Sequence, residues 1–307
     1  MTDDEPLVLV LGPDAAAERP RRAQAASPEA LPSGPLELGH RTLEMGLRSW
    51  VEAQTRARLG YVEQLYTFGD RGRTAADGGR VLSIGYLALG REAGAPAMAG
   101  AAWRSWYRYF PWEDWRRGRP AALDRLVRQL GRWADAGSAR ERAARRERVV
   151  ECFGAEGTWS EERALERYEL LYEVGLAPEA HRDGLRAWAK LADAPAAEPM
   201  QSDHRRILAT AIGRLRGKIK YRPLVFELMP PAFTFLQLQR AVEALAGVRL
   251  HKQNFRRLVV QQGLVEETGR IVTATGGRPA REIRFRQDAI QERLVPGLRL
   301  PIARASE

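Results

Sequence analysis

The chain has 307 residues, 44% of them hydrophobic, a net charge of +10 and a single cysteine, Cys152. This length suggests two domains. The composition excludes a membrane span, because no stretch approaches the ~20 unbroken apolar residues that a transmembrane helix needs. The acidic N-terminus lacks the order of a secretory signal, and one cysteine excludes both a disulfide framework and a Cys-rich metal site. We therefore expect a cytoplasmic protein without membrane contact.

The N-terminal part predicts strands around one helix. Leu7–Leu11 is a short apolar run typical of a buried strand, and apolar residues recur at helical spacing across Thr42–Arg58, with Gly60 as a stop. The segments Tyr61–Phe68 and Val81–Leu89 are rich in β-branched and aromatic residues, which favours two strands joined by an exposed hairpin loop.

From about Ala95 to Leu191 the pattern becomes helical. One apolar stripe runs from Leu123 to Trp133, and a second runs from Leu165 to Tyr172 before Gly175. Between them, Arg140–Val150 is a highly charged helix that reads as a solvated face. The segment Ala194–Pro199 cannot continue a helix and is interpreted as an interdomain linker.

The C-terminal part has the order helix, helix, helix, hairpin, which is typical of a winged helix-turn-helix. A helix capped by Asp203 is expected to reach about Arg216. Thr234 caps the next helix, which Gly247 ends, and a third precedes Gly263. The third helix is placed at Leu250–Gln262, and the two extended segments of the hairpin at Arg270–Ala274 and Arg281–Arg286.

Charge is distributed unevenly along the chain. Residues 202–300 hold 19 Lys and Arg against 8 Asp and Glu, an excess of 11 over a total of +10, so the remainder is near neutral. A basic domain joined to a neutral one is typical of a nucleic-acid-binding protein with a separate second function. An arginine-rich genome would explain the ratio of Arg to Lys but not this asymmetry.

The third C-terminal helix is the candidate recognition helix. Its apolar residues Phe255, Leu258 and Val259 share one face, and its first turns present polar side chains that pair with base edges in the major groove. Asn254 and Arg256 are the first candidates for base contact, and Arg281 and Arg284 are expected to meet phosphate. A solvated basic helix beside a surface hairpin is the alternative, but it leaves the crowding of these side chains unexplained. The full predicted DNA-binding set is Lys252, Gln253, Asn254, Arg256, Arg257, Arg278, Arg281 and Arg284.

A segment of the N-terminal half aligns with the Nudix box, whose clustered carboxylates hold Mg²⁺ for attack of water on a pyrophosphate. Gly34, Arg48 and Glu52 occupy their expected places. His40, Ser49, Ala53 and Thr55 replace the first Glu, two of the three carboxylates at the metal end, and the last Gly. Since a lone Glu52 is a poor magnesium site, we predict no catalytic residue, no metal, no cofactor and no hydrolysis.

The sequence resembles the Nudix-related transcriptional regulators of NAD metabolism, of the NrtR/NadQ type. The resemblance rests on residues 31–55, 61–73 and 109–115 in the N-terminal half, and on 215–245, 251–269 and 276–285 in the C-terminal half. It implies a homodimer that represses genes of NAD synthesis or salvage from a palindromic double-stranded DNA operator. It also implies control by an adenine-nucleotide-like or niacin-related effector such as ATP, NAD or ADP-ribose. The helical stretch between about 116 and 200 has no place in this pattern.

The expected fold is therefore α+β, with an N-terminal Nudix-like α/β/α sandwich and a C-terminal winged helix-turn-helix. The effector domain is placed at 1–200, with its helical extension beginning at about 95, and the DNA-binding domain at 201–300. Two alternatives stay open: an active Nudix pyrophosphatase for ADP-ribose or a dinucleotide with an accessory nucleic-acid-binding domain, and an RNA-binding module. The deep, narrow major groove of RNA disfavours the second.

Candidate effector contacts follow from the Nudix comparison. Arg48, Arg71 and Arg73 are candidates for phosphate contact, and Tyr66 and Phe68 for stacking on a base, although aromatic residues on a strand are more often core. A dense aromatic cluster either packs in the core or a dimer interface, which is favoured, or forms a wall that binds a base. Its members are Trp103, Trp106, Tyr107, Tyr109, Phe110, Trp112 and Trp115. Glu113 and Asp114 within it either bind ribose hydroxyls or cap a helix, and Cys152 is expected in the core.

Overall fold

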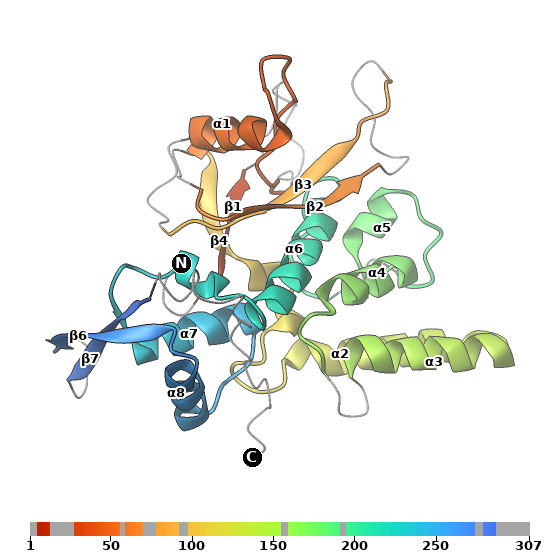
Figure 1. Cartoon of the computed structure of the whole chain (residues 1–307). Coiled ribbons are helices and arrows are strands. Elements are labelled where there is room, and N and C mark those ends of the chain that lie inside the picture. The colour runs from red at the N-terminus through yellow and green to blue at the C-terminus, as the bar shows by residue number, and fades with distance from the viewer. Residues whose placement is uncertain are drawn as a thin grey trace.

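The structure is a computed structural model that describes residues 5–12, 28–55, 59–69, 78–91, 98–154, 159–190, 195–273 and 279–286. Figure 1 shows the elements, which follow one another as β1 (Leu7–Leu11), α1 (Leu43–Thr55), β2 (Val62–Phe68), β3 (Ser83–Ala88), β4 (Ala101–Ser105), η1 (Trp106–Arg108), η2 (Pro111–Glu113), α2 (Ala121–Asp135), α3 (Ala139–Phe153), α4 (Ala164–Val174), α5 (Pro178–Arg182), α6 (His204–Ile219), η4 (Leu224–Glu227), β5 (Phe233–Thr234), α7 (Phe235–Ala246), α8 (Lys252–Gln261), β6 (Val265–Val272) and β7 (Ala280–Phe285).

The N-terminal strands form two antiparallel pairs, β1 with β4 and β2 with β3. Strand β1 buries Leu9, Val10 and Leu11 in succession, which explains its unbroken apolar sequence. The register of β2 against β3 shifts between Gln64 and Thr67. Helix α1 lies at the end of the molecule farthest from α8 (Figure 1). The predicted strands β1, β2 and β3 and the predicted helix α1 are confirmed.

The expected helical extension from about residue 95 begins later than predicted. Ala101–Ser105 is strand β4, whose five residues pair in register with all of β1, from Leu7 opposite Ser105 to Leu11 opposite Ala101. Strand pairing with a distant segment overrides local sequence pattern, which carries no information about the partner strand. The α-helices of this extension start at Ala121 with α2. The last of them, α5, ends at Arg182.

Helices α2 and α3 form a hairpin that projects from the body (Figure 1). A capping box starts α3, in which Ser138 accepts from the Glu141 backbone and the Glu141 carboxylate accepts from the Ser138 backbone. Gly154 and Gly175 end α3 and α4 in the left-handed conformation, with φ of 55° and 87°. Helix α4 packs against α6.

The C-terminal elements have the order expected of a winged helix. Thr234 starts α7 with a capping box to Gln237, and Gly247, at φ 76°, ends it. Strands β6 and β7 form the wing, and β5 joins the sheet beside β7. Two details differ from expectation: the side chain of Asp203 makes no capping bond to α6, and the first wing strand begins at Val265, earlier than predicted.

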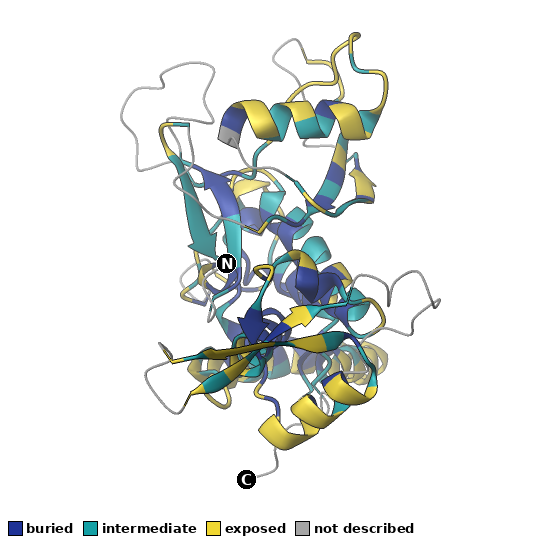
Figure 2. Ribbon diagram, turned by 60° about the vertical axis from the view of Figure 1, so that its left-hand side comes forward, coloured by how far each residue is buried: buried dark blue, intermediate teal, exposed yellow. Residues whose placement is uncertain are grey.

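One continuous hydrophobic core runs through both parts of the chain (Figure 2). Helix α6 lies at its centre and contacts α4, α7, β2 and β3. Tyr109, Phe110 and Trp112 are fully buried there, so the packing interpretation of these aromatic residues is confirmed, as is the core position of Cys152. Within the part of the chain that is described, no helix combines the length and apolar character needed to cross a bilayer.

Candidate DNA-binding and effector sites

Helix α8 presents a polar face to solvent. Phe255 and Val259 are its buried residues, one turn apart. Because residues in an α-helix advance by 100° each, Gln253 and Arg257 lie opposite this buried face, and Asn254 and Arg256 lie at its two margins. Lys252, Gln253, Asn254, Arg256 and Arg257 are all exposed. The five side chains predicted to meet DNA are therefore all free of the core.

Arg256 differs from its neighbours because it is already engaged. Its guanidinium carbon lies 4.9 Å from the ring centroid of Phe235, the first residue of α7, in a cation–π arrangement. Arg257 has no carboxylate partner among the described residues. Of the two arginines, Arg257 is thus the more available for a base or a phosphate, although the sequence pattern favoured Arg256.

The wing arginines are paired across the hairpin. Arg284 donates to Glu266 at 2.6 Å, and Arg281 donates to Glu267 at 2.9 Å. Both pairs are exposed, so water screens them and neither is strongly held. Contact of these arginines with phosphate would exchange one anionic partner for another. The third predicted wing residue, Arg278, lies outside the described residues.

Helix α1 carries two residues of the predicted Nudix-box alignment, Arg48 and Glu52. Arg48 donates to Glu44 at 2.9 Å and to the backbone carbonyls of Leu59 and Gly60 at 2.9 and 3.2 Å. It therefore ties the end of the loop after α1 back onto the helix, a structural role beside the predicted effector contact. Glu52 is exposed. Among the described residues, no cluster of three or more His, Cys, Asp or Glu side chains could hold a metal ion.

Gly34 is required by packing. A Cβ atom there would lie 2.1 Å from the ring of Trp50, which donates from Nε1 to the Pro35 carbonyl at 2.9 Å. In a Nudix box the position of Trp50 holds an aliphatic residue. The indole thus fills space beside Gly34 and fixes the preceding loop on α1.

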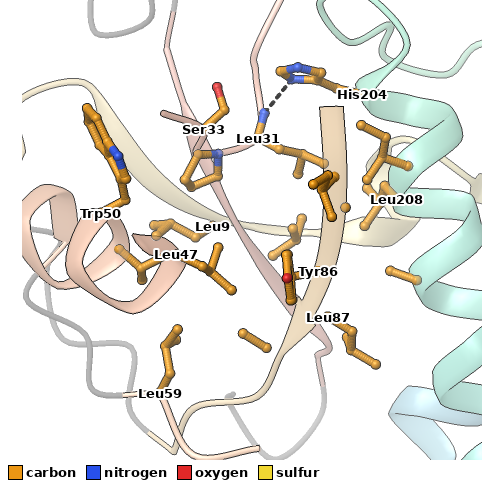
Figure 3. Close-up of a pocket in the computed structure, with 18 of the residues that line it drawn as sticks. Leu9, Leu31, Ser33, Leu47, Trp50, Leu59, Tyr86, Leu87, His204 and Leu208 are labelled. Carbon is orange, nitrogen blue, oxygen red and sulfur yellow. Dashed lines mark hydrogen bonds between the residues drawn. The ribbon is translucent and has the colours of Figure 1, made fainter. Parts of the chain in front are cut away.

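A cavity of about 900 Å³ lies between α1, the strands and α6 (Figure 3). Leu9, Leu47, Trp50 and Tyr86 line it from the α1 and strand side, and Leu208 from α6. No Asp, Glu, Lys or Arg is among its described lining residues. Since an unpaired charge is costly in such surroundings, the cavity suits an aromatic or uncharged group better than a diphosphate.

His204 provides a polar edge to this cavity. Its Nδ1 accepts a hydrogen bond from the Leu31 backbone at 2.9 Å, which joins the start of α6 to the loop before α1 (Figure 3). Leu245 of α7 is also part of the lining. One cavity is therefore bordered by α1, by α6 and by α7, the first helix of the helix-turn-helix.

The other predicted effector residues are dispersed. Phe68 is buried at 4% exposure, whereas Tyr66 is 64% exposed, and their rings meet edge to face at 5.5 Å. Neither lines the cavity. Arg71 and Arg73 lie outside the described residues. The structure thus brings Arg48 near the cavity through α1 but does not gather the predicted set around it.

Sequence reasoning missed a buried ionic cluster between the two parts of the chain. Glu113 is fully buried and accepts from Arg167 at 2.6 and 2.8 Å and from Arg216 at 2.5 Å. Burial alone would raise the pKa of Glu113, but the two guanidinium groups hold it below its usual value. Glu113 therefore neither binds ribose nor caps a helix, and Asp114 pairs with Arg116 at 2.8 Å.

This cluster also holds the end of α7. Arg216 donates to the Leu245 carbonyl at 2.9 Å, Tyr107 donates to the Ala244 carbonyl at 2.6 Å, and the Trp115 backbone donates to the Gly247 carbonyl at 2.6 Å. A Cβ at Gly247 would lie 2.3 Å from the Glu113 carbonyl oxygen. The turn between α7 and α8 is thus anchored on residues 107–115.

Comparison with known proteins shows which proteins this chain is similar to. Residues 225–285 match the family described as the NrtR DNA-binding winged helix domain. The C-terminal domain is therefore similar to the NrtR winged helix over these residues. A curated relative from Acinetobacter baylyi, the ADPR responsive transcriptional repressor NtrR, is 43% identical over 83 residues, which span 27% of this chain and 33% of the relative. The predicted resemblance to Nudix-related regulators is confirmed.

Solved structures extend the likeness of fold to the rest of the chain. Shewanella oneidensis NrtR complexed with a 27mer DNA has a TM-score of 0.55 at 18% identity, covering 97% of this chain and 94% of that one. A MutT/nudix family protein from Enterococcus faecalis has a TM-score of 0.50 at 17% identity, covering 92% and 82%. At such identities the likeness concerns the fold alone. The predicted α+β class, with a Nudix-like N-terminal fold and a C-terminal winged helix, is confirmed.

Proposed function

We propose that this protein is a DNA-binding transcriptional repressor of NAD synthesis or salvage genes, controlled by an effector bound in its Nudix-like part. The observation that carries the proposal is the exposed polar face of α8, with Gln253, Asn254 and Arg257 at its start, within a domain that matches the NrtR winged helix. A homodimer would present two such helices to a palindromic duplex. We also propose that residues 1–200 form the effector-sensing domain and residues 201–300 the DNA-binding domain.

The cavity bordered by α1 and α6 is the proposed effector site. Its apolar lining supports binding of the base or pyridine part of ADP-ribose, NAD, ATP or a niacin-related compound, with phosphate groups left outside it. Helix α6 provides a route to the DNA-binding domain, because Leu208 lines the cavity while Arg216, two turns on, binds the carbonyl of Leu245 in α7. An effector that fits only one arrangement of α6 would shift the population of DNA-competent protein.

This function is tested by combining ligand binding with DNA binding. The purified protein should shift duplexes from the promoters of NAD synthesis or salvage genes and leave a shuffled duplex unshifted at the same salt concentration. In a thermal-shift panel of NAD, ADP-ribose, ATP, nicotinate and nicotinamide, the true effector should raise the midpoint, since it binds the native state alone. The same compound must change operator affinity. A compound that stabilises the protein without altering DNA binding would contradict control through this site.

We further propose that the Nudix-like part does not hydrolyse nucleotides. Ser49 and Ala53 on α1 stand where two metal-binding carboxylates are needed, and the single exposed Glu52 cannot replace them. ADP-ribose or NAD incubated with Mg²⁺ or Mn²⁺ should remain intact, as in a blank without protein. Turnover that disappears in Glu52→Gln would instead favour the pyrophosphatase alternative.

A further inference from the structure

We infer that the α2–α3 hairpin provides a second DNA-binding surface, in which arginines along α2 contact the phosphate backbone outside the sequence read by α8. This inference rests on the proposed function. The surface consists of Arg125, Arg128 and Arg132 of α2 together with Arg117, four residues before its start, and is here called the α2 ridge. It belongs to the helical stretch that the family resemblance did not explain.

The hairpin is strongly basic, which the charge balance of the whole N-terminal half conceals. Residues 116–154 hold 11 Arg against 5 Asp and Glu, an excess of 6. Acidic residues elsewhere in the first 201 positions cancel this excess. Local clustering, rather than the total for a domain, determines whether a surface attracts a polyanion.

The arginines of α2 share its exposed side. Leu123, Leu126 and Leu130 face the core and are completely buried. Arg125, Arg128 and Arg132 follow at intervals of three and four residues, the spacing of a single helix face, and all three are exposed.

Most other arginines of the hairpin are already neutralised. Arg119 pairs with Asp124 at 2.8 Å, Arg146 with Asp135 at 2.7 Å, and Arg145 with Glu141 at 3.4 Å. By contrast, Arg117, Arg128 and Arg132 have no carboxylate partner among the described residues. Their charge, like that of the exposed Arg140 and Arg142 on α3, therefore remains available to an external anion.

The ridge begins next to the helix-turn-helix. The hydrogen bond from the Trp115 backbone to the Gly247 carbonyl joins the segment just before α2 to the turn between α7 and α8. That turn exposes Arg249, and Arg117 is exposed two residues after Trp115. Helix α8 and the hairpin lie at the same end of the molecule, away from α1 (Figure 1). Duplex DNA held by α8 is a polyanion that extends in both directions beyond the bases that α8 reads.

The length of α2 sets how much flanking DNA it can follow. Its 15 residues span about 22 Å at about 1.5 Å per residue. Since each base pair advances the duplex by about 3.4 Å, the ridge can accompany roughly six base pairs. Phosphate contacts of this kind add affinity without sequence preference and depend strongly on salt.

The test compares duplex lengths and charge variants of the full chain. One duplex contains only the operator, and a second carries ten further base pairs at each end. Wild type is compared with the triple variant R117Q/R128Q/R132Q. The matched control, R146Q/R148Q/R163Q, removes the same charge from arginines that are paired with Asp135, Glu173 and Glu151.

Wild type should bind the long duplex roughly tenfold more tightly than the short one, and the triple variant should lose this advantage. The slope of log affinity against log salt on the long duplex should fall by about two to three, with no change on the short duplex. The control should behave as wild type. Equal binding of both duplexes by wild type, or an unchanged salt slope in the triple variant, would contradict DNA contact by the α2 ridge. Either result would leave the proposed repressor function unaffected. Failure of wild type to bind any operator would overturn both.

Discussion

Replacing Glu113 with alanine is expected to lower the free energy of unfolding by about 3–5 kcal/mol. The carboxylate is completely buried and accepts three hydrogen bonds from Arg167 and Arg216, which are themselves fully buried. Without it, two guanidinium groups remain in the core with no counter-ion. Both parts of the chain should be affected, because Arg216 also holds the Leu245 carbonyl at the end of α7.

Urea unfolding followed by tryptophan fluorescence measures this effect. Glu198→Ala is the matched control, because Glu198 accepts from Arg108 at 2.6 Å in a pair that is exposed to solvent. Such pairs contribute about 0–1 kcal/mol. Similar losses in the two variants would contradict the central role of Glu113.

The same cluster predicts a dependence on pH. The pKa of Glu113 is lowered in the folded state, so its contribution to stability is complete above the usual carboxyl pKa and is lost as pH falls through the lowered value. The difference in stability between wild type and Glu113→Gln should therefore be constant near neutral pH and shrink in strong acid. A difference that grew toward acid would reverse the sign of this argument.

The C-terminal domain was readable from sequence because its signals are local. Thr234 and Gly247 mark both ends of α7 through capping and left-handed conformation, and both were predicted at the right positions. The buried pair Phe255 and Val259 fixes which face of α8 is exposed. Each of these features depends on residues within one or two turns of the chain.

The N-terminal part was harder to predict because its decisive contacts are between distant residues. Strand β4 exists through pairing with β1, whose residues lie 90 to 98 positions earlier, and nothing in Ala101–Ser105 identifies that partner. Glu113 reaches Arg167 and Arg216 across separations of 54 and 103 residues. A buried Arg and an exposed Arg look alike in a sequence, so the cluster left no local signal beyond the aromatic residues around it.

The effector site could be predicted from the sequence only in part. The Nudix-box alignment predicted α1 and an absence of metal-binding carboxylates on it, and the structure gives a packing reason for Gly34, the ring of Trp50. The participation of α6 in the cavity was not predicted, because α6 was assigned to the DNA-binding domain alone. Helix α6 contacts both the cavity and the DNA-binding domain, and a prediction that treats the two domains separately does not include such a helix.

The second large effect concerns α8. Arg257→Ala and Asn254→Ala should each reduce discrimination between operator and random duplex by about 1–3 kcal/mol, roughly 5–150-fold, if the two side chains pair with base edges. Arg257 lies opposite the buried face of α8, and both residues fall in its first two turns, where a recognition helix meets the bases. Arg256→Ala should in addition lower stability slightly, because its guanidinium lies over Phe235.

Titration of each variant against operator and random duplex at one salt concentration separates the recognition of bases from electrostatic binding to the phosphate backbone. Gln261→Ala is the control, an exposed polar residue at the C-terminal end of the same helix, and it should leave discrimination unchanged. If Arg257→Ala weakens both duplexes equally, the side chain meets phosphate rather than a base. In that case base recognition would have to come from Gln253 or Asn254, since these are the remaining amide side chains in the first turn of α8.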